Sequence, residues 1–143
     1  MERYTAWSWA ERRPDGRPDF HVLVTCAAER KLKEFITNGT LAREILLQED
    51  LVHPHYAIRF DGQFIVSHSK GSDPLHRVCI INSTGHVTRC YGESRGSSAR
   101  QLNETRHLTV DGEGNVLVTD FNNDRVLLLK SATRTFPFLS TAR

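Results

Sequence analysis

The chain has 143 residues, of which 38% are hydrophobic and 25% are charged, and its formal net charge is +2. This length and composition fit one globular domain, and so small a positive charge does not indicate a dedicated nucleic-acid-binding protein. No apolar run approaches the roughly 18–20 residues that a membrane-crossing helix needs. The first 20 residues lack the apolar core of a secretion signal. We therefore expect a cytoplasmic protein with no membrane partner.

The N-terminal part of the sequence differs from the rest. Residues 1–19 are polar and contain Pro14, Gly16 and Pro18, which predicts a flexible segment. From residue 20 onward, short runs rich in β-branched residues alternate with turn signals such as TNGT, NSTG and DGEGN. These runs come in pairs, in chain order 21–26 and 31–37, 64–69 and 76–82, and 115–120 and 124–130. The stretch 40–47 also has helical spacing, but it occupies the same place as 86–92, so we predict a strand there.

The paired runs repeat along the chain. Val24, Val66 and Val118 occupy the same position in successive units, at intervals of 42 and 52 residues. Four-stranded repeats of this length are typical of a β-propeller, whereas a β-sandwich does not require such self-similarity. The sequence therefore predicts an all-β chain that forms a partial β-propeller of about three four-stranded antiparallel blades. Its units are approximately 20–52, 53–104 and 105–138, and the first of them lacks its innermost strand.

A gapless alignment of 55–66 with 107–118 places His55 on His107 at the start of an innermost strand. Two such histidines are candidate metal ligands. Repetition alone generates such a pair, however, so we interpret both as structural or surface histidines. We predict no metal and no cofactor.

The three cysteines form no C-x-x-C pair, and each lies in an apolar stretch: Cys26, Cys79 and Cys90. This pattern lacks the spacing of a disulfide framework or of a structural zinc site. It predicts buried, reduced thiols.

The last unit carries the most specific motif. The sequence "GNVLVTDFNNDRVLLL", preceded by "RHLTVDGE", resembles the NHL repeat. The residues that fill the pattern of that family are Asp111, Gly112, Gly114, Asn115, Asp120, Asn123, Arg125 and Val126. The middle unit keeps Gly62, Arg77 and Val78 but has His68 where the family has aspartate. In the first unit Cys26 and Lys31 take the places of the aspartate and the arginine, and the resemblance as a whole covers about residues 20–135.

The physical role of the motif is to fix a loop. Asp120 at a strand end can accept backbone N–H bonds from the loop that follows, and Asn123 tolerates the left-handed conformation that such a loop needs. Arg125 can donate charge-assisted bonds to nearby carbonyls or carboxylates. These residues are therefore predicted to be structural rather than catalytic.

The resemblance implies more about organisation and function. NHL propellers generally close with about six blades, and they often lie behind a RING and a coiled coil in tripartite-motif ubiquitin ligases. This chain has neither element and three units at most. It is therefore expected to be a fragment of a longer propeller, a chain that completes a ring as a homo-oligomer, or an open array. It is also a candidate substrate-recognition piece related to those ligases.

Strand alternation predicts where a binding surface lies. The connections between the second and third strands and the links between units emerge on one face, here called the long-loop face, and they include 69–75 and 92–105. This face carries four cationic residues: Lys70, Arg95, Arg100 and Arg106. His55 and His107 lie close to it, and these six residues are the predicted binding residues. Gly and Ser residues in the link at 92–103 predict that it is mobile. The cations indicate an acidic protein surface or an RNA backbone as partner, but only Tyr91 is available for base stacking.

The sequence contains no nucleophile elbow, H-E-x-x-H motif, P-loop or dinucleotide fingerprint. We therefore predict a non-enzymatic module that binds a protein, with no catalytic residue. RNA binding through the basic loops is the first alternative, and part of a metal-dependent propeller hydrolase or lyase is the second.

Overall fold

The structure is a computed structural model that describes residues 4–130 and the backbone of residues 138–142. These residues form three antiparallel four-stranded sheets and no α-helix, so the expected all-β class is confirmed. Sheet 1 contains β1 (Tyr4–Arg12), β2 (Pro18–Cys26), β3 (Lys31–Ile36) and β4 (Leu41–Leu46). Sheet 2 contains β5 (Pro54–Phe60), β6 (Gln63–His68), β7 (Arg77–Ile81) and β8 (Val87–Tyr91). Sheet 3 contains β9 (Thr105–Val110), β10 (Val116–Asp120), β11 (Arg125–Lys130) and β12 (Phe138–Ala142), with the 3-10 helix η1 (Phe121–Asn123) after β10.

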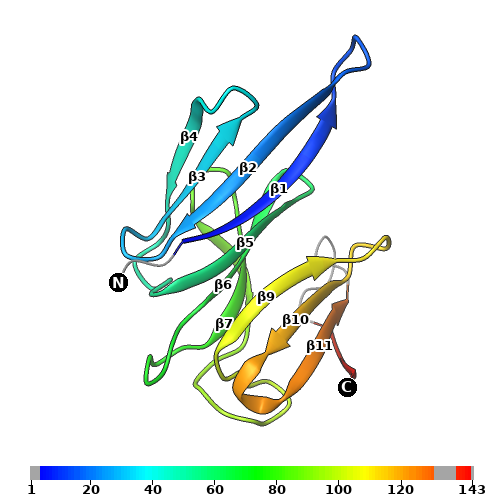
Figure 1. Ribbon diagram of the computed structural model, residues 1–143. Coiled ribbons are helices and arrows are strands. Elements are labelled where there is room, and N and C mark those ends of the chain that lie inside the picture. Colours follow the sequence, from blue (N-terminus) through cyan, green and yellow to red (C-terminus); the bar gives the residue numbers. More distant parts are fainter. Residues whose placement is uncertain (1–3, 131–137, 143) are drawn as a thin grey trace.

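Each sheet is a meander in which strands that follow one another in sequence are hydrogen-bonded neighbours. Sheet 2 lies between sheets 1 and 3 (Figure 1). One cluster of buried apolar side chains joins sheet 1 to sheet 2, and a second joins sheet 2 to sheet 3. The middle sheet is therefore covered on both faces.

The N-terminal segment is a strand and not the flexible segment that the sequence predicted. β1 pairs with β2 along its whole length, from Tyr4 opposite Cys26 to Arg12 opposite Pro18. The proline and glycine residues that suggested flexibility form the hairpin turn instead, where Gly16 takes a φ of +83° and its amide donates to the carbonyl of Arg13. The first unit therefore begins near residue 4, and β1 supplies the strand that the sequence interpretation lacked.

The register gives equivalent positions in the three sheets. Val24, Val66 and Val118 lie on the same face of their sheets, which we call the leading face, and their neighbours Leu23, Ile65 and Leu117 lie on the opposite, trailing face. The trailing face of sheet 1 packs against the leading face of sheet 2. The trailing face of sheet 2 packs in the same way against the leading face of sheet 3. The predicted repeat of the three valines therefore matches the register of the sheets.

The gapless alignment of the two histidines is wrong. Ala57 pairs with Val66, whereas Leu108 pairs with Val118, so Leu108 stands in the place of Ala57. His107 is therefore equivalent to Tyr56 and not to His55. The reason is the turn between β9 and β10, which is one residue longer than the turn between β5 and β6.

Candidate functional site

The connections that the sequence assigned to the long-loop face lie together in the structure. The amide of His76, after the β6–β7 loop, donates to the carbonyl of Glu93 in the link between sheets 2 and 3, at 2.9 Å. The amide of Asn122 in η1 donates to Asn103 of the same link at 3.0 Å. The loops and links are therefore joined to one another by backbone hydrogen bonds and form one continuous surface.

Asp120 anchors the sheet 3 side of this surface. Its carboxylate is fully buried and accepts hydrogen bonds from the Asn103 amide (2.7 Å), from Nδ2 of Asn123 (2.8 Å) and from Nε of Arg125 (2.8 Å). The sequence predicted that Asp120 accepts backbone N–H bonds from the loop that follows it. The amide that it binds belongs instead to the preceding link between sheets 2 and 3. Asn123 acts through its side chain, while Asp124 takes the left-handed conformation, with φ of 49°.

Arg125 ties down the link that the sequence predicted to be mobile. Its guanidinium donates to the carbonyls of Ser97 (3.4 Å), Ser98 (3.2 Å) and Gln101 (2.7 Å). Nδ2 of Asn123 donates to the carbonyl of Gly96 at 2.8 Å. The link is thus held by side chains of the repeat motif.

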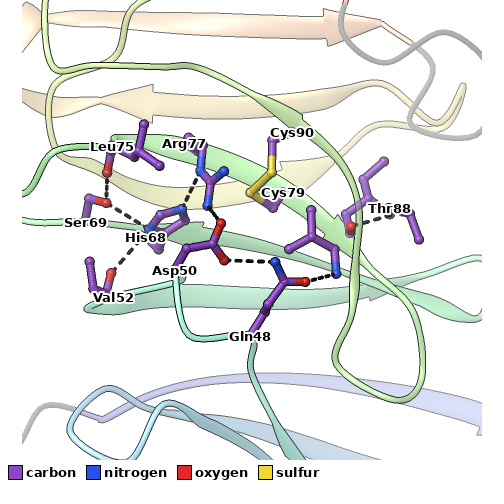
Figure 2. The surroundings of a disulfide bond; sticks show 12 residues. Gln48, Asp50, Val52, His68, Ser69, Leu75, Arg77, Cys79, Thr88 and Cys90 are labelled. Carbon is purple, nitrogen blue, oxygen red and sulfur yellow. Dashed lines mark hydrogen bonds and ion pairs between the residues drawn. A yellow bond between two sulfur atoms is a disulfide. The ribbon is translucent and has the colours of Figure 1, made fainter.

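His68 takes the place of Asp120 in sheet 2 (Figure 2). Nε of Arg77 donates to Nε2 of His68 at 3.0 Å, which requires that Nε2 is unprotonated, and Nδ1 lies 3.3 Å from the carbonyl of Val52. Burial, reinforced by the charge of Arg77, lowers the pKa of His68 to about 4. A neutral histidine therefore accepts the arginine N–H in sheet 2 that a carboxylate accepts in sheet 3.

The link between sheets 1 and 2 is fixed by the same arginine. Nη2 of Arg77 pairs with Oδ2 of Asp50 at 3.0 Å, and Oδ1 of Asp50 accepts from Gln48 at 3.2 Å. Gln48 in turn accepts from the amide of Val87 at 3.2 Å. Figure 2 shows Asp50 between Arg77 and Gln48. Arg77 thus holds the link from sheet 1 much as Arg125 holds the link from sheet 2. In sheet 1 the equivalent cross-strand pair is Cys26 and Lys31, which offers neither a carboxylate nor a guanidinium.

Two of the cysteines form a disulfide, so the prediction of three reduced thiols is wrong. Cys79 on β7 and Cys90 on β8 are directly opposite each other in the register, with Cα atoms 4.1 Å apart (Figure 2). The sequence spacing gave no motif because the pairing depends on the β7–β8 register and not on proximity along the chain. Cys26 is buried and takes no part in this disulfide.

Four of the proposed binding residues surround one junction of the loops, which we call the Gly71–Glu104 junction. Oε1 of Glu104 accepts from the amide of Gly71 at 2.7 Å, and Nη1 of Arg95 donates to the carbonyl of Gly71 at 3.1 Å. Nη2 of Arg106 lies 3.5 Å from Oε2 of Glu104. The bond from Gly71, reinforced by Arg106, holds the pKa of Glu104 below its ordinary value against the opposing effect of burial. His55 joins the junction through a 2.7 Å contact between its Nε2 and the carbonyl of Ser69.

Phe121 is an exposed apolar side chain of this surface. Its side chain is 51% exposed, and the guanidinium of Arg106 lies 3.7 Å from the centre of its ring. Lys70 precedes Gly71 and is exposed. Within residues 4–130, no side-chain hydrogen bond or ion pair engages Lys70 or Arg100. The long-loop face therefore combines one exposed aromatic ring with free cations.

The other two proposed residues lie away from the junction. Arg100 lines a shallow pocket beside Tyr91 and Glu93. His107 is exposed and contacts the Tyr56 ring edge-on at 5.2 Å, so it does not converge with His55 on a common site.

The remaining motif residues lie at the opposite ends of the strands. Asp111 in the β9–β10 turn accepts hydrogen bonds from the amides of Glu113 (2.8 Å) and Asn115 (3.0 Å). The hydrogen bond from the Asn115 side chain, together with these backbone bonds, lowers the pKa of the Asp111 carboxyl. Gly62 and Gly114 both have positive φ, +74° and +82°. A Cβ at Gly114 would lie 3.2 Å from the Phe60 ring, so this glycine also permits a close approach of two sheets.

Sequence reasoning missed the parts of the junction that depend on contacts between distant loops. His76 is fully buried, and its Nδ1 accepts from the amide of Glu104 at 3.0 Å. His53 and Asp73 approach to 2.6 Å and connect the link between sheets 1 and 2 to the β6–β7 loop. Burial alone would raise the pKa of Asp73, but the bonds from His53 and the Lys70 amide bring it below its ordinary value. An aromatic residue directly after the motif aspartate was the available signal for Phe121.

Comparisons with known proteins identify the fold and no family. No family model and no curated protein matches the chain. The chain is similar to a solved structure of a protein of unknown function from Bacteroides caccae, with a TM-score of 0.62 and 13% sequence identity. The match covers 96% of this chain and 47% of that protein, so the chain spans about half the length of that protein. No helix within the described residues is both long and apolar enough to cross a membrane.

Proposed function

We propose that the chain is a set of NHL-type propeller blades that acts as a non-enzymatic protein-binding module through the long-loop face. The observation that carries the proposal is the exposed ring of Phe121, which lies beside Arg106. The loops of this surface are held by hydrogen bonds from buried side chains of the repeat motif. An aromatic ring that is already ordered loses little side-chain entropy when a partner covers it. Such a ring beside cations suits a partner segment that carries both apolar and acidic side chains.

The organisation of the loops supports binding without catalysis. Asp120 and Arg125 are used to hold the link between sheets 2 and 3, and His68 and Arg77 hold the link between sheets 1 and 2. These four side chains are thereby engaged in structure. A rigid scaffold that presents loop side chains is a common basis of protein recognition.

Protein binding is favoured over RNA binding by the state of the cations. Arg95 donates to a backbone carbonyl, and Arg106 is paired with Glu104 and stacked on Phe121, so two of the four predicted cations are already occupied. The carboxylates of Asp73 and Glu104 share the surface and would repel phosphates. An affinity built on phosphate contacts needs several free cations.

The test is a selection of displayed random peptides on the immobilised chain, followed by binding measurements on variants. We expect the selected peptides to combine acidic and apolar residues. They should bind wild type and lose at least tenfold in affinity for Phe121→Ser and for Lys70→Ser. Matched controls are Phe20→Ser and Lys130→Ser. They remove an exposed phenylalanine and an exposed lysine at the ends of β2 and β11 that lie away from the long-loop face.

A failure of this selection would contradict the proposal in one of two ways. Peptides that bind Phe121→Ser and Lys70→Ser as well as wild type would place the interaction elsewhere. No enriched peptide, together with binding of oligouridylate that falls steeply with added salt and is abolished by Arg95→Glu and Arg100→Glu, would support the RNA alternative instead.

A further inference from the structure

Of the six faces that the three sheets present, two are not packed against another sheet of the described residues. The leading face of sheet 1 and the trailing face of sheet 3 are the ends of the stack, whereas the four faces between them are packed in the two cores. On the leading face of sheet 1, Phe20 is 53% exposed, Val22 37% and Leu41 44%. Val22, Phe35 and Leu41 stand opposite one another across β2, β3 and β4. These are large exposed fractions for apolar side chains that share one face, and they mark an interaction surface.

The open leading face has the residue types of the covered ones. Three register positions are apolar in all three sheets: Val22, Phe64 and Val116; Val24, Val66 and Val118; and Phe35, Ile81 and Leu129. In sheets 2 and 3 all six of these side chains are fully buried by the preceding sheet. The face of sheet 1 is therefore built on the same plan as faces that receive another sheet.

The open trailing face of sheet 3 follows the plan of the other trailing faces. Its apolar positions match those of sheets 1 and 2: Leu23, Ile65 and Leu117, and Leu32, Val78 and Val126. The position between them carries a small hydroxyl residue every time, as Thr25, Ser67 and Thr119. Leu117 and Val126 are half-buried, whereas their counterparts in sheets 1 and 2 are completely buried.

One position departs from the plan and is still compatible with docking. Lys33 stands where the other sheets have Cys79 and Leu127. Its ammonium pairs with Glu29 (3.4 Å) and Glu44 (3.7 Å). A lysine of this kind covers apolar surface with its aliphatic stem and keeps its charge in contact with water.

We propose that the two open faces bind a second copy of this chain, head to tail. The trailing face of sheet 3 of each copy covers the leading face of sheet 1 of the other, so two identical contacts close an arrangement of six sheets. Each contact repeats the packing that already joins sheets 1 and 2 and sheets 2 and 3. The solved structure to which this chain is similar is about twice as long as this chain, which is the length that two copies supply. A head-to-tail contact that closes gives a discrete oligomer, whereas one that does not close gives a filament.

The test is the solution mass of the chain by light scattering behind a sizing column, over a range of concentrations. The expected result is a dimer of twice 16.3 kDa. Val22→Glu on the leading face of sheet 1 and Leu117→Lys on the trailing face of sheet 3 should each weaken the dimer at least tenfold. An equimolar mixture of the two variants should form a mixed dimer, because one of its two contacts is then wild type and the other brings opposite charges to the interface.

Phe121→Ser removes an equally exposed ring from the long-loop face and should leave the dimer unchanged, which separates this proposal from the proposed function. Thermal unfolding followed by circular dichroism shows that each variant is folded. A monomeric wild type would overturn the proposal and assign the open faces to another polypeptide segment. A filament, or a dimer that dissociates in Val22→Glu but persists in Leu117→Lys, would overturn the head-to-tail closure.

Discussion

Removal of the Asp120 carboxylate tests whether the repeat motif holds the long-loop face together. Asp120→Ala deletes the acceptor of three buried hydrogen bonds, including the bond at 2.8 Å from Nε of Arg125, whose side chain is only 10% exposed. Breaking a buried ion pair from one side costs about 3–5 kcal/mol, because it leaves an uncompensated charge. Arg125 keeps its three bonds to backbone carbonyls, which places the expected loss of unfolding free energy near the lower end, about 3 kcal/mol.

The assay is urea unfolding followed by circular dichroism, together with hydrogen exchange of the Asn103 amide, which donates to Asp120 in the wild type. The matched control is Asp111→Ala, because Asp111 also accepts three hydrogen bonds but lies in an exposed turn. We expect a smaller loss for the control and faster exchange at Asn103 in Asp120→Ala alone. The reasoning is refuted if Asp120→Ala is no less stable than Asp111→Ala, or if exchange at Asn103 is unchanged.

Three further predictions concern the disulfide and the titrating groups. Reduction of the Cys79–Cys90 bond, or its removal in the double alanine variant, should lower the unfolding free energy by about 3 kcal/mol, since the two cysteines are 11 residues apart. Mass spectrometry of unreduced peptides shows whether the disulfide is present. It forms in an oxidising compartment but not in the cytoplasm. The pKa of His68 falls from 6.5 to about 4 on folding, so the unfolded chain takes up a proton first as the pH falls. The unfolding free energy should therefore decrease from about pH 6.5 to about pH 4. In urea unfolding at a series of pH values, His68→Asn should flatten this decrease. The pKa of Glu104 is lowered on folding, so its contribution to the unfolding free energy is complete above its ordinary pKa of 4.5 and is lost as the pH falls through the lower folded pKa. Glu104→Gln should therefore reduce the loss of stability below pH 4.5. An unchanged loss of stability in acid would show that the Gly71–Glu104 junction does not stabilise the fold.

The repeated apolar pattern of the sequence predicted most of the fold. β-Branched runs that recur in pairs along the chain identified β2 and β3, β6 and β7, and β10 and β11, which are the central strands of the three sheets. Central strands are covered by neighbours on both sides, so their apolar residues dominate the pattern. β1 was missed because Thr5 is its single β-branched residue, so it lacks the pattern of the other strands. Its turn with β2 also contains proline and glycine, which are equally typical of a flexible segment.

The candidate site was predictable only where it depends on short-range chemistry. Asp120 and Arg125 are cross-strand neighbours and only five residues apart in sequence, so both residues of this ion pair belong to one local motif. The Cys79–Cys90 disulfide and the misplaced equivalence of His55 and His107 depended on strand register, which a single extra turn residue shifts. The contacts of Glu104 with the Gly71 amide and of Phe121 with Arg106 join segments that are distant or unrelated in pattern, and no local signal specifies them.

The most direct test of the central claim is nuclear magnetic resonance mapping of a peptide selected on the chain. The isotope-labelled protein is titrated with that peptide, and the backbone amide shifts are followed residue by residue. The account predicts that the largest changes fall in the β6–β7 loop, in η1 and at Glu104 and Arg106, with the sheet interiors unaffected. Changes confined to the short turns at the opposite ends of the strands, such as the β9–β10 turn, would contradict it and place binding on the other side of the molecule.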